Sequence, residues 1–133
     1  SKKHWRSSGH TTGKAAHTYT VVFETFKLIE QKLKKNPVEV FVKAVENGAP
    51  REEIVAIEYG GARYPKATEC APQRRVDTVL RHFVQGAYQK SFNAKKTLVQ
   101  TLADEIILTY QLSPNSVAIA KKNELERQAD SSR

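Results

Sequence analysis

The sequence predicts a mainly α-helical fold, a helical bundle with a protruding two-stranded β-hairpin between its second and third helices. Four segments repeat apolar residues at three- and four-residue steps, the spacing of one face of a helix. One stretch, at about 54–70, instead combines β-prone residues with a pair of glycines. The 133 residues, 39% of them hydrophobic, suffice for one domain but not for two.

Residues 1–16 are rich in Ser, Thr, Gly and Lys and follow neither a helical nor a strand period. We therefore expect a basic arm that is flexible until a partner orders it, followed by a single domain over 17–133. Trp5 is the one large apolar residue of the arm. It either packs back onto the domain or stacks on a base, and the sequence leaves both open.

The first helix is predicted over 17–35. Its apolar face consists of Tyr19, Val22, Phe23, Phe26, Ile29 and Leu33. Lys32, Lys34 and Lys35 lie in its last turn, where cations compensate the negative end of the helix dipole. Contact with an anionic partner is the alternative reason for these lysines.

The second helix begins with a strong signal, because Asn36 can cap, Pro37 suits the first helical position and Glu39 can complete a capping box. Its apolar face is expected to bury Val38, Phe41, Val42 and Val45. Gly48 is expected to supply a left-handed stop before Pro50. The short connection predicts that the first two helices pack as an antiparallel hairpin.

A β-hairpin follows at about 54–70. Ile54, Val55, Ile57 and Tyr59 form one strand, 60–62 the turn and 63–70 the return strand. Pro65 cannot donate to a ladder, which makes its strand an edge. A lone hairpin is marginal unless something packs on it. The charged and aromatic residues near the turn, Arg63, Tyr64 and Lys66, therefore favour an arm that reaches a partner.

Three further helices are predicted over 74–92, 97–111 and about 120–131, the last mostly polar. The stripes of the first two are Val76, Val79, Leu80, Phe83, Val84 and Ala87, then Leu98, Val99, Leu102, Ile106, Ile107 and Tyr110. Gly86 within a helix costs about 1 kcal/mol against Ala unless a neighbouring helix needs close approach.

No catalytic or metal-binding constellation is evident. The four histidines supply no close ligand pair, and Asp104 and Glu105 would point about 100° apart on a helix. The single cysteine, Cys70, excludes an internal disulfide, and no apolar run is long enough to cross a membrane. The sequence thus predicts neither an enzyme nor a bound cofactor or metal. An RNA-processing enzyme would need a cluster of acidic residues or a metal site, and the sequence indicates neither.

Positive charge dominates the chain, which carries a net charge of +8. Residues 1–35 and 61–100 each hold eight Lys or Arg against two acidic residues, 8 − 2 = +6. Arg81 follows Arg74 by seven residues, nearly two helical turns, so both lie on one face. Basic residues at a helix start oppose the helix dipole, which favours an anionic partner for Arg74 and Arg75.

Nucleic acid is the polyanion that this mixture of basic and aromatic residues suits. The basic groups come from an arm, a hairpin, a helix start, a loop and a last helix, and this scatter favours folded RNA. A free-standing regulator that binds duplex DNA through the 74–92 helix is the alternative.

Several motifs in order then indicate a family: NPVEVFVKAVEN (36–47), IEYGGARYPKA (57–67), PQRRVD (72–77), LADEI (102–106) and PNS through KKNELER (114–127). The chain resembles the small ribosomal subunit protein S-seven family in its archaeal and eukaryotic form, from about residue 15 to 133. Members usually carry a further helix before the basic arm, and we expect this chain to begin after it.

The resemblance implies a cytoplasmic ribosomal protein without a membrane partner. It implies binding to a multi-helix junction in the 3′ major domain of small-subunit ribosomal RNA, and nucleation of the subunit head beside other head proteins. It also implies a hairpin near the exit-site transfer RNA and the messenger RNA. The RNA-binding residues predicted from charge and motif are Lys2, Lys3, Arg6, Lys14, Arg63, Tyr64, Lys66, Gln73, Arg74, Arg75, Arg81, Asn93, Lys95, Lys96, Lys121 and Lys122.

Two positions depart from the family pattern. Ala71 stands where a capping Ser often precedes the Pro, which leaves the first amides of the long helix without that cap. Ala120 stands where a lysine is common, which removes one candidate phosphate contact.

Overall fold

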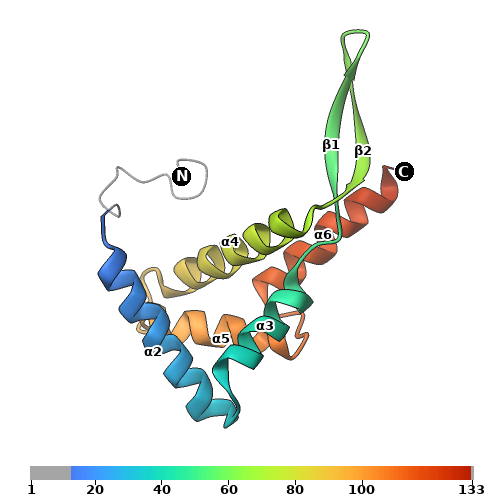
Figure 1. Ribbon diagram of the computed structural model, residues 1–133. Coiled ribbons are helices and arrows are strands. Elements are labelled where there is room, and N and C mark those ends of the chain that lie inside the picture. The colour runs from blue at the N-terminus through green and yellow to red at the C-terminus, as the bar shows by residue number, and fades with distance from the viewer. Residues whose placement is uncertain (1–12, 133) are drawn as a thin grey trace.

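The computed structural model describes residues 13–132, and within them it confirms a helical body with one projecting β-hairpin (Figure 1). The hairpin stands between α3 and α4, the second and third helices of this range. The elements are α2 (Ala15–Leu33), α3 (Pro37–Gly48), β1 (Glu52–Tyr59), β2 (Ala62–Glu69), α4 (Pro72–Ser91), α5 (Leu98–Tyr110) and α6 (Val117–Ser131). No helix in this range is both long and apolar enough to span a membrane.

The helix boundaries differ from the predicted ones by at most three residues. The helix expected at 17–35 begins at Ala15 and ends at Leu33, because Lys34 turns into the left-handed conformation with φ 55°. The last helix begins at Val117 rather than near 120. Its start is fixed by Ser116, whose Oγ accepts a hydrogen bond from the Ile119 amide at 3.3 Å.

Helix α5 forms the centre of the body. It contacts α2, α3, α4 and α6, and in Figure 1 it lies below α4, between α2 and α3. Its buried residues include Thr101, Ala103, Ile106 and Thr109. Thr97 begins it with the reciprocal hydrogen bonds of a capping box to Gln100. The hydrophobic core around it contains Ile29, Val40, Ala44, Val79, Phe83, Ala103, Ile106 and Ala118.

The buried face of α3 is not the predicted one. Val38 and Val42 are exposed and Phe41 and Val45 half-buried, whereas Val40, Ala44 and Gly48 are buried. This face packs mainly on α5, and at the end of the helix the neighbours come very close, since a Cβ on Gly48 would lie 2.8 Å from Val79 Cγ2 of α4 and 3.1 Å from Thr109 Cγ2 of α5. Gly48 ends the helix without a positive φ, so the predicted left-handed stop is wrong. Glycine is required here because there is no room for a side chain.

Helix α2 packs through its second half. Ile29 is buried and Phe26 half-buried, while the predicted core residues Tyr19, Val22 and Phe23 are exposed, Tyr19 at 74%. In Figure 1, α2 and α3 diverge from their shared turn as a V instead of lying antiparallel. Both helices contact α5, and the Phe26 and Phe41 rings meet at a centroid distance of 5.4 Å.

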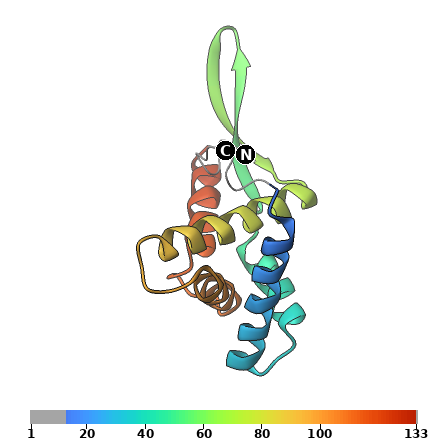
Figure 2. The same ribbon diagram turned by 90° about the vertical axis from the view of Figure 1, so that its left-hand side faces the viewer.

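The β-hairpin projects from one end of the body (Figures 1 and 2). Gly60 and Gly61 have φ of 60° and 81°, the left-handed pair that a tight two-residue hairpin turn requires. Pro65 lies opposite Ala56 in a two-stranded sheet, where both strands are edges, as predicted. Helix α6 packs on the base of the hairpin, and the distal residues of both strands are exposed.

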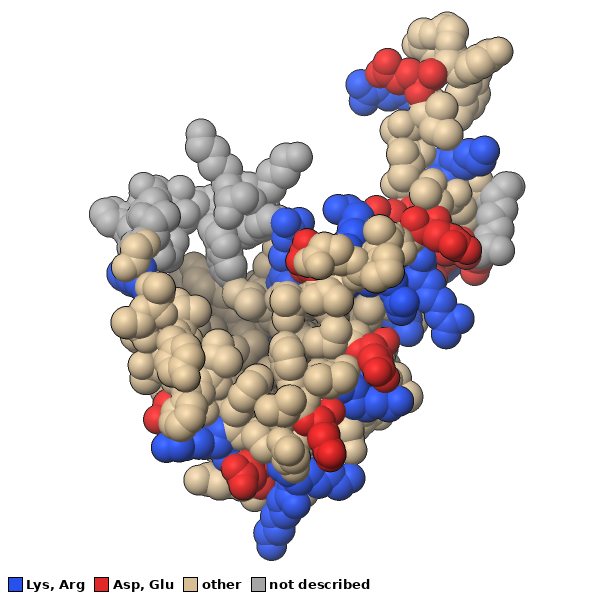
Figure 3. Space-filling model, viewed as in Figure 1, with Lys and Arg blue, Asp and Glu red and all other residues tan. Residues whose placement is uncertain are grey.

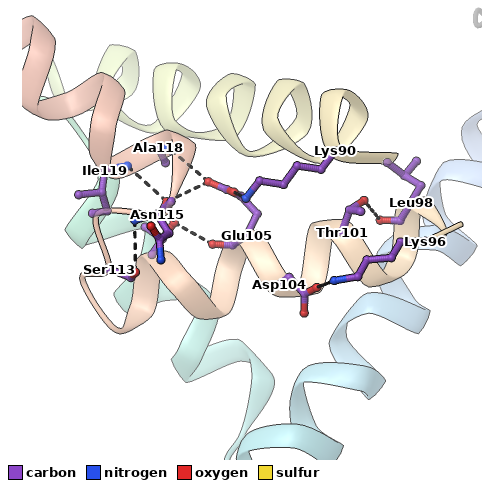
Figure 4. Close-up of polar contacts among 12 residues, drawn as sticks. Lys90, Lys96, Leu98, Thr101, Asp104, Glu105, Ser113, Asn115, Ala118 and Ile119 are labelled. Carbon is purple, nitrogen blue, oxygen red and sulfur yellow. Dashed lines mark hydrogen bonds and ion pairs between the residues drawn. The ribbon is translucent and has the colours of Figure 1, made fainter. Parts of the chain in front are cut away.

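A buried carboxylate joins three helices (Figure 4). The side chain of Glu105 in α5 is 0% exposed, and its Oε2 accepts from Lys90 Nζ of α4 at 3.0 Å. Its Oε1 accepts from Ser116 Oγ at 2.9 Å and from the Ala118 amide at 3.1 Å, at the start of α6. Gly86 of α4 lies over this cluster, where a Cβ would be 3.0 Å from Val117 Cβ. The predicted close approach at Gly86 is confirmed.

Candidate nucleic-acid interface

The predicted RNA-binding residues of the arm fall mostly outside the described range. Lys2, Lys3, Arg6 and Trp5 precede residue 13, and no contact is assigned to them. Lys14 is described; it occupies the position before the first turn of α2 and is exposed. The structure thus places one basic residue of the arm, at the start of α2.

Arg74 and Arg75 fix the base of the hairpin to α4. Arg74 forms a two-pronged ion pair with Glu53 of β1, in which Nη2 donates to Oε2 at 2.9 Å and Nε to Oε1. Arg75 Nε donates to the Pro50 carbonyl at 3.2 Å. These contacts supply an intramolecular reason for two arginines at a helix start. An anionic partner is therefore not required to explain their position, and their contact with RNA stays a prediction.

The other connections at the hairpin base come from α6 and the chain itself. The Arg51 amide donates to Glu126 Oε1 at 3.2 Å, and the Cys70 amide donates to the Arg51 carbonyl at 2.9 Å. Partial burial, and then the charge of Glu53, raises the pKa of the half-buried Cys70 thiol, which keeps the thiol protonated. Charged side chains of both signs crowd this base in Figure 3. Together with the arginine contacts, these bonds set the direction in which the hairpin leaves the body.

The exposed side of α4 carries basic and aromatic residues along its length. Arg74, Arg81 and Tyr88 are spaced by seven residues, nearly two turns, and therefore lie along one line of the helix. Phe92 follows directly after the helix; it is 70% exposed, and its ring lies 6.2 Å from that of Tyr88. We call Arg74, Arg81, Tyr88 and Phe92 the α4 surface. It combines phosphate-binding groups with faces on which bases can stack.

The loop after α4 extends this surface with polar residues. Asn93 adopts a left-handed conformation with φ 55°, which turns the chain after Phe92. Lys95 is exposed, while Lys96 Nζ lies 3.4 Å from Asp104 Oδ2 (Figure 4). Lys32 Nζ lies 2.9 Å from Asp104 Oδ1. One carboxylate thus connects the loop to α2 and α5.

The two faces of the hairpin differ. Cross-strand partners point to the same face, so Ile57 and Tyr64 share one face with the pair Val55 and Lys66. Near the tip, on the opposite face, Arg63 Nε donates to Glu58 Oε1 at 2.9 Å. Arg63 is therefore neutralised in part, and Tyr64 and Lys66 are the hairpin residues whose exposed groups best suit nucleic acid.

The interpretation of Lys121 and Lys122 changes with the start of α6. Both lie in the second turn, not at the helix start, and the amides of Ala118 and Ile119 already donate to Glu105 and Ser116. These two first-turn amides are therefore not free to bind an anion. Lys121 is exposed, and Lys122 Nζ donates to the Asn47 carbonyl at 3.1 Å. Gln73 on α4 donates to Asp77 at 3.1 Å.

Exposed aromatic residues are the feature that the sequence analysis missed. Tyr88 belonged to no predicted site, Phe92 only ended a predicted helix, and Tyr19 and Phe23 were assigned to the core. Tyr88 follows Arg81 by seven residues and therefore shares its helix face. This spacing could have placed Tyr88 in the candidate interface.

The imidazole of His82 lies on the inner side of this region. Burial, and then the charge of Lys121, lowers the pKa of His82, which keeps the ring neutral. Its buried Nδ1 has no hydrogen-bond partner among the residues that the structure describes. Within residues 13–132, no group of three His, Cys, Asp or Glu side chains is arranged to hold a metal ion. The candidate functional groups of the described surface are basic and aromatic side chains.

Comparison with known proteins identifies the family. The model of the family described as ribosomal protein S7p/S5e matches residues 7–133. The chain belongs to this family. It is 52% identical over 132 residues, 99% of the chain, to the small ribosomal subunit protein uS7 of Nanoarchaeum equitans, of which it covers 67%. It is 47% identical over 125 residues, 94% of the chain, to the uS7 of Archaeoglobus fulgidus, of which it covers 64%.

A third relative is the small ribosomal subunit protein uS7 of Picrophilus torridus, 47% identical over 122 residues. That match covers 92% of the chain and 65% of the relative. The chain thus spans about two thirds of the length of these curated relatives. The predicted resemblance is confirmed.

We predict that Asp104→Asn lowers the free energy of unfolding by about 1 kcal/mol at pH 7. Partial burial alone would raise the pKa of Asp104, but the hydrogen bond and charge of Lys32, and then those of Lys96, lower it below its ordinary 3.8. The stabilisation is therefore fully present above pH 3.8 and is lost as the pH falls through the lower folded-state pKa.

Urea unfolding of wild type and variant at a series of pH values measures this difference. Glu46→Gln is the control, because its ion pair with Lys43 is exposed on both sides and is worth about 0.5 kcal/mol or less. A difference for Asp104→Asn that persists unchanged at a pH low enough to protonate Asp104 in the folded state would show that the carboxylate charge is not the source of the stabilisation.

Proposed function

We propose that this chain is a structural, non-catalytic component of the small ribosomal subunit that binds ribosomal RNA. Its membership of the ribosomal protein S7p/S5e family supports the proposal, and so does its similarity to archaeal proteins named small ribosomal subunit protein uS7. The observation that carries the RNA-binding part is the α4 surface, where two arginines and two aromatic rings follow one helix side.

We propose that both charge and stacking contribute to RNA binding. Arg81 and the lysines of the 93–96 loop neutralise phosphates and release counterions, which makes binding depend on salt. Tyr88 and Phe92 offer faces to bases that are not paired in the RNA. Because α4 is held by a buried core, the spacing of these groups is set before RNA arrives.

The target that we propose is a multi-helix junction in the 3′ major domain of small-subunit ribosomal RNA. Binding there would nucleate assembly of the subunit head, together with other head proteins, on cytoplasmic ribosomes. The distribution of the candidate residues over a hairpin, a helix and a loop supports a junction, since a projecting hairpin and the body can reach different segments of a folded RNA. The tip of the hairpin would lie near the exit-site transfer RNA and the messenger RNA.

A regulator that binds duplex DNA is the second candidate, because α4 is a long helix with exposed arginines. A recognition helix presents its polar side chains to the bases of the major groove. The α4 surface instead ends in two aromatic rings, Tyr88 and Phe92, which duplex bases cannot stack on. Binding to random-sequence duplex DNA with the same affinity as to folded ribosomal RNA at low salt would favour the regulator.

We predict that Arg81→Ala and Phe92→Ala weaken RNA binding in different ways. Arg81→Ala should lower the slope of log affinity against log salt by roughly 0.7 to 0.9, the value for one lost phosphate contact. Phe92→Ala should cost about 1–3 kcal/mol of binding free energy and leave that slope unchanged, because stacking releases no counterions. Filter binding to a folded 3′ major domain fragment over a salt series measures both.

Lys43→Ala serves as the control, since it removes one exposed positive charge from α3, away from α4. It should leave affinity and slope nearly unchanged. Equal effects from Lys43→Ala and Arg81→Ala would mean that net charge, rather than the α4 surface, drives binding.

We predict that deleting residues 60–64, with a short turn joining the strands, leaves the helical body folded and its primary RNA binding intact. The deleted residues are exposed, and the contacts of Arg74, Arg75 and Glu126 hold the retained base. The loss should appear in assembled subunits, as weaker retention of exit-site transfer RNA or poorer maintenance of the reading frame. Thermal unfolding, RNA binding and a frameshift reporter separate these outcomes.

Failure of the shortened protein to fold would make the hairpin tip part of the folding core. Normal folding, assembly and translation together would show that the hairpin has no role in handling transfer RNA.

A further inference from the structure

A basic hollow lies at the end of the body opposite the hairpin. It is formed at the turn between α2 and α3, the lowest point of the chain in Figure 1, and has a volume of about 1060 Å³. Its lining residues are Lys27, Glu30, Gln31, Lys34, Lys35, Asn36 and Pro37. Three lysines therefore face one carboxylate, and lysine side chains project from this end of the molecule in Figure 3. None of these residues belongs to the interface described above.

Lys34 is the unusual member of this group. It ends α2 in the left-handed conformation, with φ 55° and ψ 35°, and its amide donates to the Glu30 carbonyl at 2.8 Å. Glycine is the usual residue here, because L-residues lose energy in this region of backbone space. Within residues 13–132 the exposed side chain of Lys34 forms no hydrogen bond or ion pair, so no described contact stabilises it in return.

The helix dipole does not account for Lys34. An exposed cation at a helix end gains no more from the dipole than an L-residue loses in the left-handed conformation. The last turn of α2 already contains Lys32, whose ammonium pairs with Asp104. The neighbouring Lys35 donates to Tyr110 Oη at 3.2 Å, and Lys27 lies 4.7 Å from the centre of the Phe23 ring. Stability alone would favour glycine at position 34.

We propose that Lys34, flanked by Lys27 and Lys35, binds the phosphate backbone of a second RNA segment, separate from the one along α4 and the hairpin. This inference rests on the proposed function. Phosphate oxygens accept hydrogen bonds from ammonium groups without any apolar anchor. The hollow offers charged and amide side chains with Pro37 as its one apolar lining residue, which suits a phosphodiester chain better than a protein segment.

The position of the hollow means that RNA bound there would lie far from RNA bound at the hairpin. The hairpin and the α2–α3 turn lie at opposite ends of the molecule in both ribbon views (Figures 1 and 2). RNA held at both ends would be bridged by the rigid body between them. The chain would then fix the relative position of two RNA segments in addition to binding one.

Lys34→Gly tests the proposal in the full chain, with the folded 3′ major domain RNA as the probe. The melting temperature should stay unchanged or rise, because glycine relieves the left-handed backbone. The salt slope of RNA binding should fall by roughly 0.7 to 0.9. Lys34→Arg should keep the slope, and Lys43→Ala, a neighbouring lysine outside the hollow, should also leave it unchanged.

Directed cleavage locates the second segment. An iron chelate tethered at Lys34→Cys, in a Cys70→Ser background, should cut RNA at positions different from those cut by a tether at Arg63→Cys. An unchanged salt slope in Lys34→Gly, or no cleavage from position 34, would overturn the proposal. The proposed function would still stand in that case, provided that the wild type binds the RNA. Loss of an acidic protein partner, with RNA binding unaffected, would likewise overturn it. Absence of RNA binding by the wild type would refute both.

Discussion

The arrangement of this protein depends on one buried carboxylate, Glu105. It accepts hydrogen bonds from Lys90 of α4 and from the Ser116 hydroxyl and Ala118 amide that begin α6. Loss of this carboxylate would leave the buried Ala118 amide without its acceptor, which costs about 1–3 kcal/mol for that group alone, a large share of the stability of a small domain. Glu105 thereby couples the helix that carries the candidate RNA surface to the helix that packs on the hairpin.

The direction of the hairpin depends on the helices that Glu105 joins. Helix α6 contacts both strands, and Arg74 and Arg75 tie the start of α4 to Glu53 and the Pro50 carbonyl. A two-stranded hairpin alone is marginal, so its projection from the body requires these contacts at its base. The same arginines were predicted to bind RNA, and the structure gives them a scaffolding role first. The α4 surface and the hairpin consequently form parts of one rigid unit.

Sequence periodicity predicted the helices, the hairpin turn at Gly60 and Gly61 and the close approach at Gly86, because each depends on local geometry. It failed for the buried face of α3, where β-branched residues occur on both sides of the helix and packing on α5, with close approach at Gly48, selects the buried side. It also missed Glu105, since an acidic residue in an apolar helix shows no sign of its partners on α4 and α6. Contacts between distant segments are what sequence patterns omit.

The central claim is that one side of the body, formed by the α4 surface, the following loop and the hairpin, is the main RNA-binding surface. Ultraviolet cross-linking of the assembled small subunit, followed by mass spectrometry of the cross-linked peptides, tests it most directly. The account predicts cross-links at Tyr64, Tyr88 and Phe92, whose rings are exposed. Cross-links confined to α3 and the C-terminal half of α6, with none on α4 or the hairpin, would contradict it.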